Sequence, residues 1–186
     1  MPEAFSGQFD DDVDFVVCRQ VLEHISAPHE FLAQLRLAIG SRHTGVYFEV
    51  PNMMCALESG VPWTIIYEHC AYYSPASFVW LFQDCGFDVQ KLTEDYDGQF
   101  LGIEATPAAA SNSYGPRKGL STNSLQAIRS CVEQFVEQTD DRQQRLRDVL
   151  IDQCQRGGRV VVWGAGRTHG QFSKFARRPH DGAQHC

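Results

Sequence analysis

The stretch Asp-Phe-Val-Val-Cys-Arg-Gln-Val-Leu-Glu-His at residues 14–24 decides the fold of this chain. Its apolar half predicts a strand over residues 13–18, buried on both faces, and the residues that follow predict a short helical turn. Between the two lies a polar junction of Cys18, Arg19 and Gln20. Ligands of open α/β sheets bind at such junctions, outside the carboxyl ends of the strands. The stretch therefore predicts an α/β fold with a ligand site at this junction.

The residues downstream alternate between helical and strand patterns. In chain order they predict a helix over 28–39 with Ser26 as its N-cap, a strand over 45–50, a loop over 53–73, a helix that starts after Ser74, and strands over 87–95 and 99–105. Asp97-Gly98 is a good turn for joining the last two strands as a hairpin. The loop is long for a compact domain, and loops of this kind are often functional.

This order of elements resembles the second half of the sheet of class I S-adenosylmethionine-dependent methyltransferases, strands four to seven with a terminal antiparallel hairpin. The resemblance covers residues 13 to about 106. It implies that Cys18, Arg19 and Gln20 lie near the methionine part of the cofactor. In that family a longer segment with the glycine-rich cofactor loop precedes the fourth strand. We therefore expect this chain to supply only the far wall of the cofactor pocket, and to bind S-adenosylmethionine weakly or not at all.

Residues 65–74, Ile-Ile-Tyr-Glu-His-Cys-Ala-Tyr-Tyr-Ser, bring a base, a carboxylate and three phenols into one segment. An imidazole with an ordinary pKa near 6.5 suits proton abstraction at neutral pH, and phenols can stabilise a developing enolate oxygen. From the residues alone, the alternative is a loop whose aromatic side chains pack and whose histidine is solvated.

The same segment is similar to the signature of the sugar C-methyltransferase-like branch, which methylates carbon next to a keto group in nucleotide-linked deoxysugars. The similarity implies that His69 is the catalytic base, that Glu68 orients it, and that a tyrosine assists. The tyrosine of the branch often stands two places before the glutamate. This chain has Ile66 there and Tyr67 next to it, so Tyr67 is the matching candidate.

Two further motifs fit the same branch. Glu49-Val-Pro51-Asn52 is similar to the Glu-Val-Pro that closes the fifth strand, and it either shapes the mouth of the acceptor pocket or only ends the strand. Glu23 and His24 resemble catalytic residues, but in the family this pair mostly supports the fold.

The C-terminal third predicts a separate unit. We expect a partial methyltransferase domain over 1–106, a linker over 107–123, and over 124–186 a long helix followed by the truncated start of a Rossmann-like domain. The strand expected over 159–163 runs into Gly164-Ala-Gly166, but the complete G-x-G-x-x-G is absent. The basic, aperiodic tail indicates a truncated or frameshifted end.

Composition excludes several functions. The net charge of −7, with no Lys/Arg cluster outside the last twenty residues, argues against a nucleic-acid partner. Membrane spans need about 20 apolar residues, and no such run or signal peptide is visible. Seven cysteines without a C-x-x-C pair predict reduced thiols and a cytoplasmic location. We expect no metal, because the histidines lack ligand spacing with cysteine or with one another: His24, His29, His43 and His69.

The sequence thus predicts S-adenosylmethionine-dependent methylation of carbon next to a keto group, in a nucleotide-linked sugar or a similar small molecule. The alternative is a non-catalytic module, which self-associates through the exposed edge of its first strand, or a fragment without function.

Overall fold

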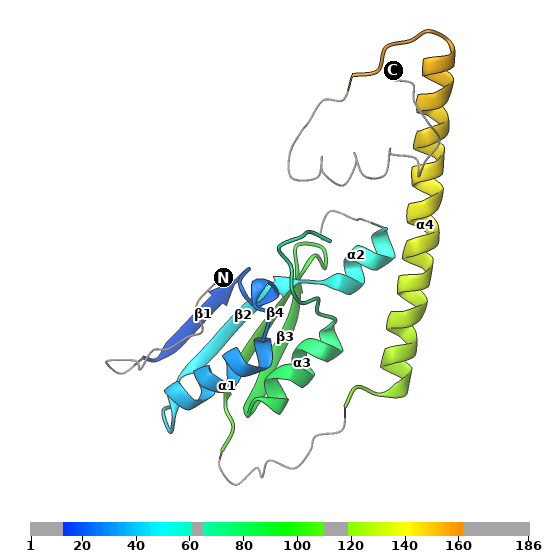
Figure 1. The fold of residues 1–186 in the computed structure, drawn as a ribbon. Helices are drawn as coiled ribbons and strands as arrows, with labels where there is room; N and C mark the ends of the chain where they lie inside the picture. Colours follow the sequence, from blue (N-terminus) through cyan, green and yellow to red (C-terminus); the bar gives the residue numbers. More distant parts are fainter. Residues whose placement is uncertain (1–12, 61–64, 110–118, 162–186) are drawn as a thin grey trace. The chain divides into compact units, whose positions relative to one another are not determined.

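The computed structural model describes residues 13–60, 65–109 and 119–161 (Figure 1). The chain divides into two compact units, Met1–Cys131 and Val132–Cys186, which are described separately. The elements are, in chain order, β1 (Phe15–Arg19), the 3₁₀ turn η1 (Leu22–His24), α1 (Pro28–Ile39), β2 (Gly45–Pro51), α2 (Met53–Ser59), α3 (Pro75–Asp84), β3 (Phe87–Asp95), β4 (Phe100–Pro107) and α4 (Thr122–Gln155).

The first unit is built on a four-stranded mixed sheet in the order β1-β2-β4-β3. β1 and β2 pair in parallel through the crossover helix α1, whereas β4 is antiparallel to both β2 and β3. The expected α/β class and the terminal antiparallel hairpin are confirmed. At the hairpin tip, Tyr96, Asp97 and Gly98 all have positive φ, of 53°, 55° and 79°.

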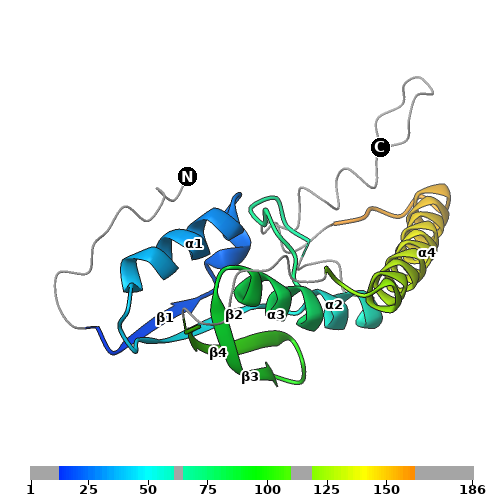
Figure 2. The same ribbon diagram turned by 90° about the horizontal axis from the view of Figure 1, so that it is seen from below.

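Helices α1 and α3 lie on one face of this sheet (Figures 1 and 2). Phe82 of α3 is fully buried, and its ring meets those of Phe48, Phe78 and Phe87 at centroid distances of 5.1, 5.3 and 5.7 Å. The core therefore forms between the helices and the side chains of β2, β4 and β3 that point toward them. It contains residues of α1, β2, α3, β3 and β4: Leu32, Leu35, Ile39, Val46, Phe48, Val50, Phe78, Phe82, Phe87, Leu101 and Ile103.

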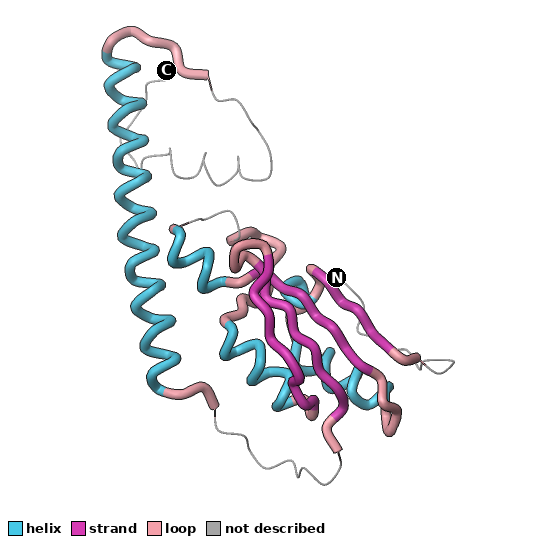
Figure 3. The backbone as a smooth tube through the Cα atoms, turned by 180° about the vertical axis from the view of Figure 1, so that it is seen from behind, coloured by secondary structure: helices cyan, strands magenta, loops and turns pink. Residues whose placement is uncertain are grey.

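The opposite face of the sheet carries the alternate side chains of β1. Figure 3 shows the strands from this side, with α1 and α3 behind them. Phe15 and Val17 are 54% and 60% exposed here, whereas Val16 and Cys18 pack toward the core. The expectation of a strand buried on both faces is therefore wrong for β1. An apolar run shows how much apolar surface a strand has, but not how many layers cover it.

Two local expectations are also corrected. The N-cap of α1 is Ala27, not Ser26, because Pro28 takes the first helical position and the residue before a proline is held out of the helical region. The segment expected as one long loop starts with a helix, α2. The side chain of Asn52 accepts a hydrogen bond from the Met54 N–H, and Gly60 ends the helix in the left-handed conformation.

The C-terminal part contains the expected long helix, α4, which runs for 34 residues. The strand expected over 159–163 is not formed at Arg159–Val161, which are described and lie outside any strand or helix. The glycine turn and the tail after it lie outside the described residues, as does most of the predicted linker. Among the helices of the described ranges, none is both long and apolar enough for a bilayer span.

Candidate functional site

The polar junction lies at the carboxyl ends of β1 and β2. Glu49 of β2 is the acceptor that the side chains of Arg19 and Gln20 share. The guanidinium Nη2 of Arg19 and the amide Nε2 of Gln20 both donate to Oε1 of Glu49, each at 3.1 Å. The hydroxyl of Tyr47 donates to Oε2 at 3.4 Å. Gln20 has a φ of 54°, and its backbone N–H donates to the carbonyl of Glu49 at 2.9 Å. The left-handed turn at Gln20 thus directs both its side chain and its amide toward Glu49.

Electrostatics keep the Glu49 carboxylate charged. Burial alone would raise its pKa, because the side chain is 5% exposed. The hydrogen bonds from Arg19, Gln20 and Tyr47 and the charge of Arg19 outweigh burial, so the pKa of Glu49 lies below its usual value. Burial and the charge of Glu49 raise the pKa of the Tyr47 phenol. Together with Asp95 and Tyr96 of the hairpin, Arg19, Tyr47 and Glu49 line an open hollow.

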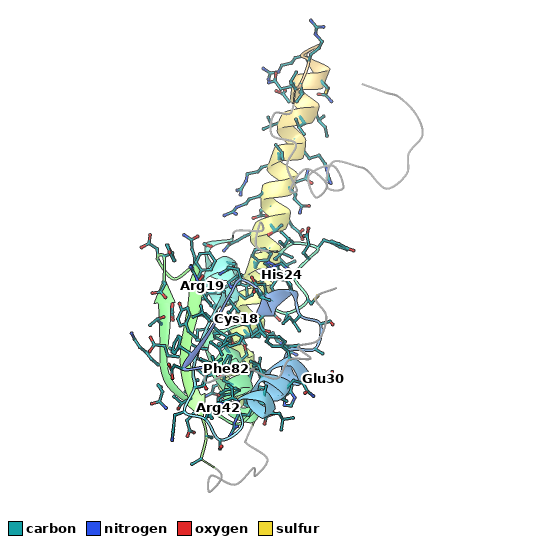
Figure 4. All side chains as sticks on the ribbon, turned by 90° about the vertical axis from the view of Figure 1, so that its left-hand side faces the viewer. Cys18, Arg19, His24, Glu30, Arg42 and Phe82 are labelled. Atoms are coloured by element: carbon teal, nitrogen blue, oxygen red, sulfur yellow. The ribbon has the colours of Figure 1, made fainter. Side chains whose placement is uncertain are left out.

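The three cofactor candidates point in different directions. Arg19 faces the hollow, with 54% of its side chain exposed, and Gln20 turns toward Glu49. Cys18 packs toward the core on the other face, where burial and the charge of Glu23 raise the pKa of its thiol to about 11. In Figure 4, Arg19 and His24 lie at the same end of the sheet, and Arg42 lies at the opposite end.

A second cluster forms where the segment 65–73 returns to η1. The backbone N–H groups of Cys70 and Ala71 donate to the carbonyl of Glu23 at 2.7 and 3.1 Å. His24 donates from Nδ1 to the carbonyl of Glu68 at 3.0 Å. These bonds place the imidazole of His69 edge-on against that of His24, with ring centroids 5.0 Å apart. The ring of Tyr72 also lies edge-on to that of His69, at 5.9 Å between centroids.

The carboxyl group of Glu23 is the most buried polar group of this cluster. Its residue is 1% exposed, and Oε2 has no hydrogen-bond partner among the described residues. Burial raises the pKa of Glu23, and its own backbone hydrogen bond and the nearby His24 only partly offset the increase. One ligand atom each from Glu23, His24 and His69 lie within 4.8 Å of one another.

The predicted catalytic residues are not all brought together. His69 lines a narrow hollow with Glu23, Tyr72 and the apolar side chains of Pro51, Met53 and Ala71. Glu68 meets His24 through its backbone carbonyl, and Tyr67 is 96% exposed. The residue that the sequence analysis missed as a partner of His69 is Glu23, although it was noted as part of the Glu-His pair. His24 and His69, which have no ligand spacing in the sequence, are brought together by tertiary contacts.

Comparison with protein families matches residues 3–92 to a family described as a methyltransferase domain. The match covers just under half of the chain. A search of curated proteins gives no match.

Several solved structures align with just over half of this chain. A chain of the complex between the Haloferax volcanii Trm112 methyltransferase activator and a methyltransferase aligns at 17% identity and a TM-score of 0.44, over 54% of this chain and 57% of that chain. Magnesium protoporphyrin IX methyltransferase from Synechocystis PCC 6803, with SAH bound, aligns at 13% identity and 0.40, over 54% and 48%. The small RNA methyltransferase HEN1 aligns at 17% and 0.38, over 56% and 15%. The chain thus covers less than two thirds of each.

Proposed function

We propose that the first unit is the acceptor-binding side of an S-adenosylmethionine-dependent methyltransferase. The family match over residues 3–92 supports this reaction class. The observation that carries the proposal is the position of His69, which lies beside Pro51 at the end of β2 and next to a buried carboxyl group. In open α/β sheets this end of the strands is where ligands bind.

For the acceptor, we propose a small molecule with a carbon next to a keto group, of which a nucleotide-linked sugar is the leading example. His69 takes a proton from that carbon, and the C–H electrons form an enolate. S-adenosylmethionine, when bound, would supply the methyl group to the enolate carbon, with S-adenosylhomocysteine as the leaving group. The phenol of Tyr72 packs against His69, and its hydroxyl would have to exchange its 3.5 Å hydrogen bond to the Ile66 carbonyl for one to the enolate oxygen.

For the cofactor, the described residues offer the corner formed by Arg19, Gln20 and Glu49. The exposed guanidinium of Arg19 suits the carboxylate of the methionine part, with Glu49 holding the guanidinium in place. Among the described residues, this corner would contact one side of the cofactor. We therefore expect the affinity of this chain for S-adenosylmethionine to be weaker than micromolar.

The role of His69 is testable without the cofactor, because proton abstraction precedes methyl transfer. A nucleotide-linked keto-deoxysugar in D₂O should exchange the hydrogen next to its keto group when the protein is added, which NMR measures. Replacing a general base lowers such a rate by about 10²- to 10⁴-fold, so we expect His69→Asn to lose at least about 100-fold. The matched control is His29→Asn, which removes an exposed histidine that pairs with Asp84 on another part of the fold.

Equal exchange by the wild type and His69→Asn would refute the role of His69. Calorimetric titration with S-adenosylmethionine tests the cofactor part separately, and micromolar binding would contradict the expectation of weak affinity.

A second candidate function is self-association along β1. Among the described residues, β1 pairs on one side only, and it exposes Phe15 and Val17 at the edge of the sheet. An edge strand of this kind offers unpaired N–H and C=O groups to another strand.

A further inference from the structure

We propose that Glu23, His24 and His69 form a binding site for a divalent transition-metal cation, with Zn²⁺, Fe²⁺, Co²⁺ and Mn²⁺ as the class of ion. The cluster offers one carboxylate oxygen and two imidazole nitrogens, all within 4.8 Å of one another. Two histidines and one carboxylate are a common ligand set for such ions, whereas Ca²⁺ and Mg²⁺ prefer oxygen ligands alone.

The hydrogen bond of His24 sets up its ring as a ligand. A backbone carbonyl can only accept, so the bond from Nδ1 to the Glu68 carbonyl, 3.0 Å long, places the proton of the neutral ring on Nδ1. Nε2 then carries a lone pair, and it lies 3.9 Å from Oε1 of Glu23. Metal-bound histidines usually donate their other ring N–H to a carbonyl or carboxylate in the same way.

This tautomer leaves two acceptor atoms facing each other. Neither the Nε2 lone pair of His24 nor the Oε1 of a charged Glu23 can donate, and a distance of 3.9 Å is too long for a hydrogen bond. The other oxygen of Glu23 is buried with no hydrogen-bond partner in the described part of the chain. Burying such a group costs free energy unless it is paired. A cation between Glu23 and His24 would pair both acceptors at once.

The geometry requires only a small adjustment. Ligand atoms lie about 2.0–2.2 Å from a bound zinc ion, so two ligands of one tetrahedral ion are roughly 3.5 Å apart. Side-chain shifts of about 1 Å would bring the present cluster to that spacing. Pro51, Met53 and Ala71 line the narrow hollow beside the cluster.

Binding of a cation by this cluster does not depend on methyl transfer. His69 would bind the cation through a ring-nitrogen lone pair, and it needs such a lone pair to accept a proton. The cation and the proposed proton abstraction therefore compete for His69. Failure of the metal experiment would therefore leave the exchange experiment on the keto sugar unaffected, and the reverse also holds.

The test is titration of the full chain with Co²⁺ after removal of metals by a chelator. We expect the first equivalent to give the d–d absorption of a cobalt ion with nitrogen and oxygen ligands. Glu23→Gln keeps the shape of the side chain while removing its charge, and it should weaken Co²⁺ binding at least about tenfold. His24→Asn and His69→Asn should do the same, and His29→Asn, outside the cluster, should bind like the wild type.

Circular dichroism of each variant shows whether the fold is retained. If a histidine variant unfolds, the comparison of Co²⁺ binding by Glu23→Gln and the wild type decides the test. Three results would overturn the proposal. These are no Co²⁺ binding by the wild type, equal binding by folded Glu23→Gln, and a thiolate-to-cobalt charge-transfer band with the first equivalent, which would assign the ion to cysteine.

Discussion

Glu49 is the residue that holds the polar end of the sheet together. It receives hydrogen bonds from Arg19, Gln20 and Tyr47 while its own residue is 4% exposed. Each of these donors loses its acceptor if the carboxylate is removed. The charge of Glu49 therefore contributes to the stability of the fold as well as to the candidate cofactor corner.

We predict that Glu49→Gln lowers the free energy of unfolding by about 1–3 kcal/mol at neutral pH, the usual cost of a disrupted buried hydrogen-bond network. The pKa of Glu49 is lowered in the folded state, so its contribution is present above the unfolded pKa of about 4.3. It disappears as the pH falls through the lower, folded pKa. The difference between wild type and variant should therefore shrink below about pH 4.

Urea denaturation across this pH range measures the difference. Glu104→Gln is the control, because Glu104 is half exposed and pairs with Lys91 only at the surface, at 3.8 Å. A gap between wild type and Glu49→Gln that stays constant with pH would contradict the assigned pKa direction.

At the scale of single residues, the sequence located the junction but not all of its contacts. Cys18, Arg19 and Gln20 follow a strand, so their place at its carboxyl end was predictable. That Cys18 points away from Arg19 follows from strand alternation. The contact of Glu23 with His69 depends on two backbone hydrogen bonds from the distant segment around Cys70, and no local pattern encodes it.

Among the elements, α1 is the clearest case of a helix divided between core and solvent. Leu32 is fully buried and Leu37 is 71% exposed, although both are leucines in the same helix. We predict that Leu32→Ala lowers the free energy of unfolding by about 2–5 kcal/mol, from lost apolar burial and the cavity left behind. Leu37→Ala should change it by no more than about 0.5 kcal/mol.

Urea denaturation of both variants provides the comparison, with the same change of side chain at each site. Similar changes in the free energy of unfolding at the two positions would mean that α1 does not pack through the face that carries Leu32.

The pattern of apolar residues predicted α1, α3 and the hairpin, because each has a regular period and a clear stop. It missed α2, a short helix whose start depends on the Asn52 side chain and whose end depends on Gly60. It also expected a strand where Arg159–Val161 form none, because apolar β-branched residues favour a strand only where a partner strand is available.

For the whole molecule, the position of β1 at the edge of the described sheet leads to a prediction about association. We predict that the 21.0 kDa chain forms dimers as its concentration rises, through the edge of β1 that has no partner strand among the described residues. Val17→Lys places a charge on the exposed side of this strand and should shift the equilibrium to monomer. Light scattering coupled to gel filtration measures the mass at each concentration.

Leu37→Lys is the matched control, since it adds the same charge at an exposed apolar residue of α1. A chain that is monomeric throughout, or a Val17→Lys variant that associates like the wild type, would rule out β1 as the contact.

Gly45 pairs with Phe15 across β1 and β2, and the Phe15 ring lies directly over it. A Cβ at position 45 would come within 2.6 Å of that ring, so only glycine leaves room for it. A slip of β1 by two residues would set Phe15 against the ring of Tyr47 instead. Glycine at position 45 thus favours the observed register of β1 and β2 at this end of the strand pair. Phe15 and Gly45 add an apolar contact, at one end of the strand pair, to the hydrogen bonds that align Arg19 with Glu49 at the other end.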